Sequence, residues 1–129
     1  MTAFIRGFLG SALLIVAASA AYAHHSATMF EQTKQITVEG VVKEFQYSNP
    51  HSWLLVDVTD KNGKVTTWGF EAEGPSTLQR AGIRPSVFPA GTKVTMTGRP
   101  MKDGSPAAIW VVAIKDGKKY DPRAGFAVK

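Results

Sequence analysis

The chain has 129 residues, a formal net charge of +5 at pH 7 and no cysteine. The lack of cysteine excludes disulfides, a lipid-anchored amino terminus and zinc sites built on Cys/His spacing. The lysines are scattered among acidic residues, so the basic charge does not form a nucleic-acid-binding tail, and no nucleic-acid partner is expected.

The amino-terminal stretch has the pattern of a secretory signal peptide. Arg6 supplies a positive charge, residues 8–20 form an apolar segment, and Ala21 and Ala23 are the small residues of a cleavage site. The apolar segment is shorter than the roughly 20 residues that a membrane-spanning helix needs. We therefore expect cleavage rather than anchoring, a mature chain that begins at His24 in the bacterial periplasm, and no membrane association afterwards.

The pattern divides the chain into four parts. The signal peptide (1–23) precedes an N-terminal arm (24–35) with little periodicity, a β domain (36–120) and a C-terminal tail (121–129) that we expect to be loose. The mature part is long enough for one hydrophobic core.

The β domain contains five predicted strands. Runs rich in apolar, β-branched and aromatic residues, bounded by turn signals, place these strands at residues 36–48, 53–59, 65–72, 93–98 and 108–114, and the first and third show period-two alternation. The apolar phase of the first strand shifts at Gly40, which is typical of a β-bulge. The sequence DKNGK predicts a hairpin between the second and third strands, and KDGKKY predicts a last turn with room for a short strand.

A short helix is expected between the third and fourth strands. Pro75 or Ser76 can begin it, Leu78 can face the core, and Gly82 can end it. Three strands, a short helix and two more strands form the element order of an OB-fold, a five-stranded Greek-key barrel. The predicted fold class is therefore all-β with one short helix, as a small OB-fold-like barrel. An open β-sandwich is the alternative.

The chain's three histidines, His24, His25 and His51, are the candidate metal ligands. If His24 becomes the terminus, its free amine and its imidazole form one chelate, and His51 supplies a third nitrogen. This histidine brace suits Cu(II), which prefers tetragonal nitrogen ligation. His25 is an alternative ligand, and Met29 is a soft donor for Cu(I). The simpler interpretation leaves the first two histidines as polar surface and His51 as a turn-capping residue.

A second candidate site involves the aromatic residues. Trp53, Tyr47 and Asn49 lie around the first break in the β domain, where they could form a stacking surface at the mouth of a barrel. The other interpretation assigns the tryptophans to the core and its cover. No catalytic residue follows from either interpretation.

Two further sets of charged residues lie close together in the sequence. Glu71 and Glu73 share one face of the third strand, but no third member of a catalytic set accompanies them. We interpret this pair as a solvent-exposed strand end. Arg99 and Lys102 flank a polar turn and are candidate contacts for an anion.

Several stretches together resemble a family of uncharacterised bacterial exported proteins, a domain of unknown function. They are AHHS after the leader, GVVKEFQYSNPHSWLLVDV, WGFE, LQRAGI and GRPMKDGSP, and they span almost all of the mature chain. The most specific are the paired histidines, Asn49-Pro50-His51 with Trp53, and the turn formed by DGSP. The resemblance implies secretion and one small β domain, but no reaction.

Two hypotheses from different classes follow. The first is a periplasmic module that holds copper, or another divalent metal, through His24 and His51. The second is a metal-free OB-like module that binds a small ligand or a protein partner on the Trp53 side. A copper oxidase built on the same brace is a third, weaker hypothesis, because nothing in the sequence defines a substrate pocket. None of these three hypotheses specifies an oligomeric state.

Overall fold

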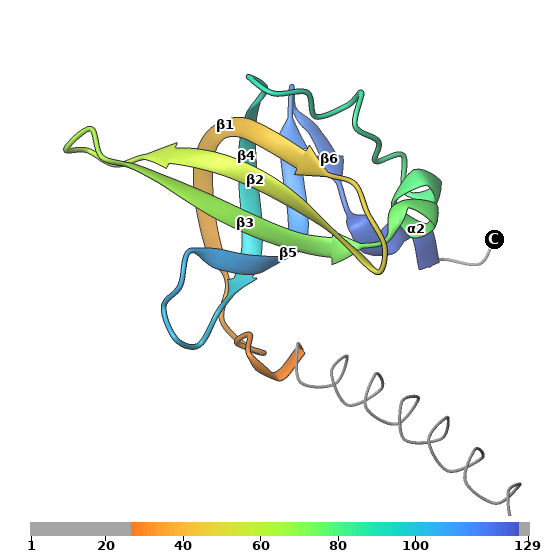
Figure 1. The fold of residues 1–129 in the computed structure, drawn as a ribbon, viewed down its shortest axis with the longest axis horizontal. Coiled ribbons are helices and arrows are strands. Elements are labelled where there is room, and N and C mark those ends of the chain that lie inside the picture. The colour runs from red at the N-terminus through yellow and green to blue at the C-terminus, as the bar shows by residue number, and fades with distance from the viewer. Residues whose placement is uncertain (1–26, 127–129) are drawn as a thin grey trace, which may run out of the picture.

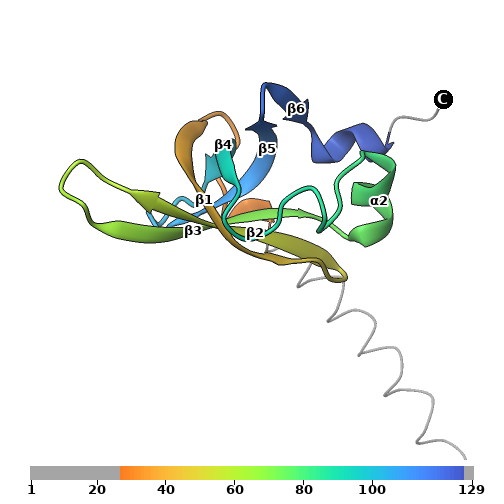
Figure 2. The same ribbon diagram turned by 90° about the horizontal axis from the view of Figure 1, so that it is seen from above.

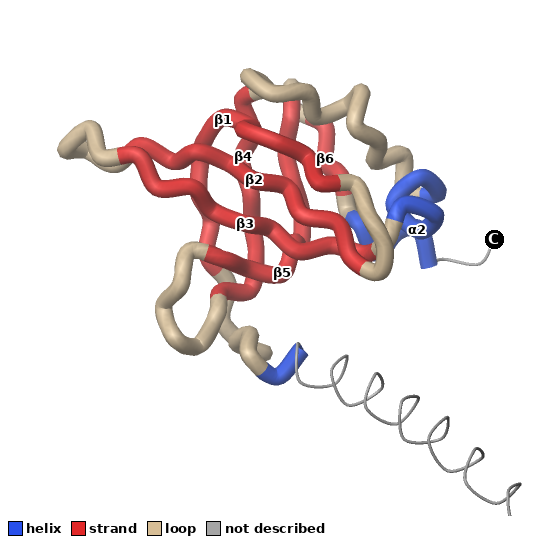
Figure 3. The backbone as a smooth tube through the Cα atoms, viewed as in Figure 1, coloured by secondary structure: helices blue, strands red, loops and turns tan. Residues whose placement is uncertain are grey.

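The computed structural model describes residues 27–126, which form a β-barrel with helical segments at one end (Figures 1 and 3). Its strands and helices are β1 (Ile36–Gln46), β2 (His51–Thr59), β3 (Val65–Glu73), α2 (Pro75–Arg80), β4 (Lys93–Pro100), β5 (Ala107–Lys115), β6 (Lys118–Tyr120) and the 3-10 helix η1 (Pro122–Phe126). Within that part of the chain, no helix is long and apolar enough to cross a bilayer.

The sheet closes on itself through its first five strands. The strand order is β3-β2-β1-β4-β5-β6, and an additional parallel pairing joins β3 to β5. Closure removes the exposed edges that an open sheet of this size would carry. The element order and this closure confirm the predicted OB-fold-like barrel with one short helix. The short strand β6 extends β5 beyond the five strands of the barrel.

The long first strand bends because it changes partners along its length. Its first half pairs with β4 and its second half with β2, and the register shifts between Val42 and Glu44. The predicted bulge at Gly40 is therefore misplaced. Gly40 is instead needed for close packing, because a Cβ there would lie 2.5 Å from the carbonyl oxygen of Asp57 and 2.6 Å from Cγ1 of Val56.

The core fills the barrel and extends under the helical end. Trp110, Phe70 and Phe88 are its largest fully buried side chains, and the rings of Phe88 and Trp110 meet edge to face with centroids 5.5 Å apart. Leu78 of α2 is fully buried, as the helix prediction required. Full burial of each such large apolar side chain stabilises the fold by about 1.5–3 kcal/mol.

Both ends of the described chain are attached to the barrel. Phe30 forms an isolated bridge with Met101, and the backbone N–H of Glu31 donates to the carbonyl of Pro100 over 2.8 Å. At the other end, η1 lies beside α2 in both ribbon views (Figures 1 and 2), and Nε of Arg80 donates to the carbonyl of Gly125 over 3.0 Å. The tail predicted to be loose is thus packed from residue 122 to residue 126.

Candidate functional site

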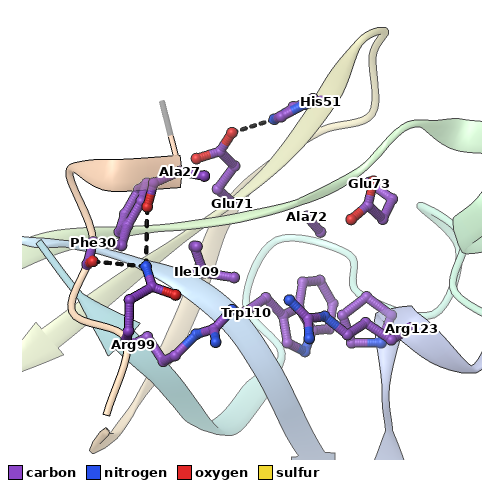
Figure 4. A pocket seen from close by; sticks show the side chains of 12 residues that line it. Ala27, Phe30, His51, Glu71, Ala72, Glu73, Arg99, Ile109, Trp110 and Arg123 are labelled. Carbon is purple, nitrogen blue, oxygen red and sulfur yellow. Dashed lines mark hydrogen bonds and ion pairs between the residues drawn. The ribbon is translucent and has the colours of Figure 1, made fainter. Parts of the chain in front are cut away.

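A pocket opens where the barrel closure ends. The parallel pairing of β3 with β5 runs only as far as Glu71 and Ile109. Beyond this point the two strands line a pocket of about 340 Å³. The strand residues that line it are Glu71, Ala72 and Glu73 of β3 and Ile109 and Trp110 of β5. The other lining residues come from the arm, β2, β4 and η1; they are Ala27, Phe30, Gln32, His51, Arg99, Pro122 and Arg123 (Figure 4).

His51 and Glu71 form the polar pair at one side of this pocket (Figure 4). His51 is the first residue of β2 and stands opposite Glu73 in the ladder, while Nδ1 of its ring is hydrogen-bonded to Oε1 of Glu71. The His51 side chain is 41% exposed and the Glu71 side chain only 10%. Burial of a carboxylate is costly unless it is paired, so this bond stabilises both side chains in one arrangement.

The bond leaves the second ring nitrogen of His51 available. Among the described residues, none is hydrogen-bonded to Nε2 of this ring. A histidine whose Nδ1 is held by a carboxylate presents its Nε2 in a fixed direction, which is the usual arrangement behind a metal-bound imidazole. In residues 27–126 there is no cluster of three or more His, Cys, Asp or Glu side chains that could hold a metal ion by itself.

The opposite side of the pocket is basic. Arg99 on β4 and Arg123 on η1 both line it, and neither forms an ion pair with any residue of the described range. Nε of Arg99 and Nε1 of Trp110 are both buried, and neither has a hydrogen-bond partner among the described residues. Such buried, unpartnered donors are rare in folded proteins.

The N-terminal arm forms one wall of the pocket through Ala27, Phe30 and Gln32. Nε2 of Gln32 donates to the carbonyls of Ala27 and Phe30 over 3.1 and 3.0 Å, which folds the arm into a compact turn. Ala27 itself lines the pocket. His24 and His25 lie outside the described residues, three and two positions before Ala27.

The three residues of the predicted aromatic site, Tyr47, Asn49 and Trp53, do not line this pocket. The hydroxyl of Tyr47 donates to the carbonyls of Pro75 and Ile83 over 2.9 and 3.2 Å, so this residue joins the end of β1 to α2. Trp53 packs over Gly69 of β3, where an added Cβ would lie 3.2 Å from the indole carbon Cε3. Asn49 is exposed in the turn between β1 and β2.

Sequence reasoning missed three of the pocket residues. Glu71 is only 8% exposed, so its interpretation as a solvent-exposed strand end is wrong. The sequence offers no role for Trp110 beyond that of the tryptophans in the core or its cover, and Arg123 belongs to the tail that was expected to be loose. In β3 four consecutive residues, Gly69 to Ala72, are buried although the sequence alternates regularly there, so no signal in the sequence marked Glu71 as covered.

Comparisons with known proteins identify a family but no activity. A family model described as a family of unknown function (DUF6152) matches residues 12–110, which is most of the chain. No curated protein and no solved structure matches the chain.

Proposed function

The chain belongs to this family of unknown function, DUF6152, and we propose that it is an exported module that binds copper at the pocket between β3 and β5. The amine and imidazole of a mature terminus at His24 would supply two nitrogens, and Nε2 of His51 the third. His25 is the alternative partner for the terminal amine. The protein would store, carry or sense the metal in the periplasm.

The orientation of His51 is the observation that carries this proposal. Its Nδ1 is bound to the carboxylate of Glu71, and its other nitrogen is free of described partners. Ligating histidines almost always donate their second ring N–H to a carboxylate, a carbonyl or water, and this contact sets both the tautomer and the direction of the ligating nitrogen. The pair therefore has the arrangement of a ligand together with its supporting carboxylate.

The position of Ala27 supports the participation of His24. Ala27 lines the same pocket as His51, and three residues of extended chain reach about 10 Å. From the sequence alone, the distance between His24 and His51 is limited only by the full length of the arm. The attachment of the arm at Phe30 shortens that tether, because Ala27, which lines the pocket, is only three positions after His24.

The donor set favours copper among the divalent metals. It consists of nitrogen donors, and tetragonal nitrogen ligation is typical of Cu(II), which also forms the most stable complexes in the first-row series. The lack of cysteine removes the thiolate ligands that favour zinc and Cu(I).

The test requires protein recovered after export. Mass spectrometry should show a mature chain that begins at His24. Titration with Cu(II) should then give one site, with an affinity at least tenfold higher than that of a form that keeps Ala21, Tyr22 and Ala23. The longer form has the same pocket but displaces the free amine from His24. Equal affinities would overturn the proposed chelate, and any remaining binding would belong to imidazoles alone.

A further inference from the structure

We propose that the same pocket has a second, separate function, which is to bind a small organic acid through Arg99, Arg123 and the indole N–H of Trp110. This inference goes beyond the copper site and does not depend on it. It places the carboxylate of the ligand at the basic side of the pocket, and its apolar body between β3 and β5.

The two unpartnered donors are the first reason for this assignment. Nε of Arg99 and Nε1 of Trp110 are both buried, both lack an acceptor among the described residues, and both belong to side chains that line one pocket. Trp110 is only 1% exposed, so bulk water does not satisfy its N–H. A buried donor without an acceptor costs free energy, and two of them in one pocket indicate that an acceptor belongs there.

Charge is the second reason. Arg99 and Arg123 approach one cavity from β4 and η1, and within the described chain neither is neutralised by an ion pair. The two cations repel each other unless a negative group lies between them. A guanidinium group presents its N–H groups in a planar fork that matches the two oxygens of a carboxylate.

The walls of the pocket favour an organic acid over an inorganic anion. Phe30, Ile109 and Pro122 contribute apolar surface to the wall of the pocket. The volume of about 340 Å³ lies at the lower end of the range for small-molecule sites and exceeds the needs of a single small ion. Glu73, which has no ion pair in the described chain, stands across the pocket and can accept a hydrogen bond from a hydroxyl or amino group of the ligand.

The test uses the mature protein after metal has been removed on a chelating resin. Benzoate is the probe, and the readout is the NMR signals of the three indole N–H groups of uniformly ¹⁵N-labelled protein. Saturable binding should shift the Trp110 indole signal to lower field, as a new hydrogen bond does, and leave those of Trp53 and Trp68 nearly unchanged. No saturable shift at Trp110 would overturn the proposal.

Two variants separate the basic pocket from general attraction of anions. Arg123 is exposed, so Arg123→Gln should fold normally and weaken benzoate binding at least tenfold. Arg84→Gln removes the same charge from an exposed position outside the pocket and should leave binding unchanged. Equal effects of the two variants would mean that benzoate responds only to the net charge of the protein, which would overturn the assignment.

A second anion and a third variant complete the design. Inorganic phosphate should bind at least tenfold more weakly than benzoate, because it cannot use the apolar walls. Phosphate binding as tight as benzoate binding would contradict an organic acid. The form that keeps Ala21, Tyr22 and Ala23 should keep benzoate binding in metal-free protein, so that loss of copper binding and loss of acid binding report on the two proposals separately.

Discussion

The ring of His51 and the carboxylate of Glu71 are bonded to each other diagonally across β2 and β3. The direct ladder partners are different: His51 faces Glu73, and Trp53 faces Glu71. The diagonal contact joins an imidazole at the surface to a carboxylate that is nearly buried. The direction of the free ring nitrogen therefore depends on Glu71, which would not itself be a ligand in the proposed copper site.

Replacement of Glu71 tests this dependence. Glu71→Ala should weaken Cu(II) binding by about 10–100-fold, which is the usual effect of removing the group that orients a ligating histidine. Glu71→Gln should weaken it less, because the amide oxygen can still accept a hydrogen bond from Nδ1. Competition with a chromogenic chelator measures both affinities. Glu73→Ala is the matched control on the same strand face, and an equal loss there would point to general negative charge instead.

Replacement of His51 should affect both stability and binding. His51→Ala leaves the buried Glu71 carboxylate without its partner, so the free energy of unfolding should fall by about 1–3 kcal/mol. Cu(II) affinity should fall at least tenfold. The double variant His51→Ala/Glu71→Gln should recover part of the stability, since an amide is less costly to bury, but none of the affinity. Full copper affinity in the double variant would make His51 a purely structural residue.

Gly40 should tolerate no side chain. In Gly40→Ala, the new Cβ would collide with the backbone of Asp57, so urea unfolding should show a loss of about 1–3 kcal/mol. Gly69→Ala is the matched control within the barrel. There the nearest atoms are side-chain atoms of Trp53 at 3.2 Å or more, and a small movement of the indole can relieve the contact. A larger loss for Gly69→Ala would contradict this account.

The turn after β4 should make stability dependent on pH. The hydrogen bonds that the Asp103 carboxylate accepts from the side chain and backbone of Ser105 hold the pKa of Asp103 below its usual 3.8. A lowered folded-state pKa stabilises the protein above that usual value, and the contribution is lost as the pH falls through the folded-state pKa. Asp103→Asn should therefore melt slightly below the wild type at neutral pH, and this gap should close as the pH falls below 3.8. A gap that persists in acid would contradict this origin.

The barrel could be predicted because its signals are local. Runs of apolar, β-branched and aromatic residues between turn signals marked all five barrel strands, the Asn-Gly turn marked the β2–β3 hairpin, and Pro75, Leu78 and Gly82 marked the beginning, the buried face and the end of α2. The order of these elements then limited the topology. Gly40 shows the limit of such reasoning, because a phase shift and a close approach between strands leave the same trace in a sequence.

The pocket could not be predicted because its walls are distant in sequence. His51 was singled out for its chemistry, but its partner Glu71 lies on the next strand, and a diagonal contact follows from twist and register rather than from spacing. Arg99, Trp110 and Arg123 meet only when β5 closes the barrel and η1 folds back on α2. The metal hypothesis for His24 remains a prediction.

The parallel pairing between β3 and β5 is much shorter than the antiparallel pairing between β2 and β3. Only three residue pairs close the cylinder there, whereas nine pairs join β2 to β3. Local opening is least costly where the fewest hydrogen bonds must break, so we expect the barrel to open first at the β3–β5 pairing. A ligand in the adjoining pocket would contact residues of both β3 and β5, and it would therefore raise the free energy needed to open the barrel at this pairing.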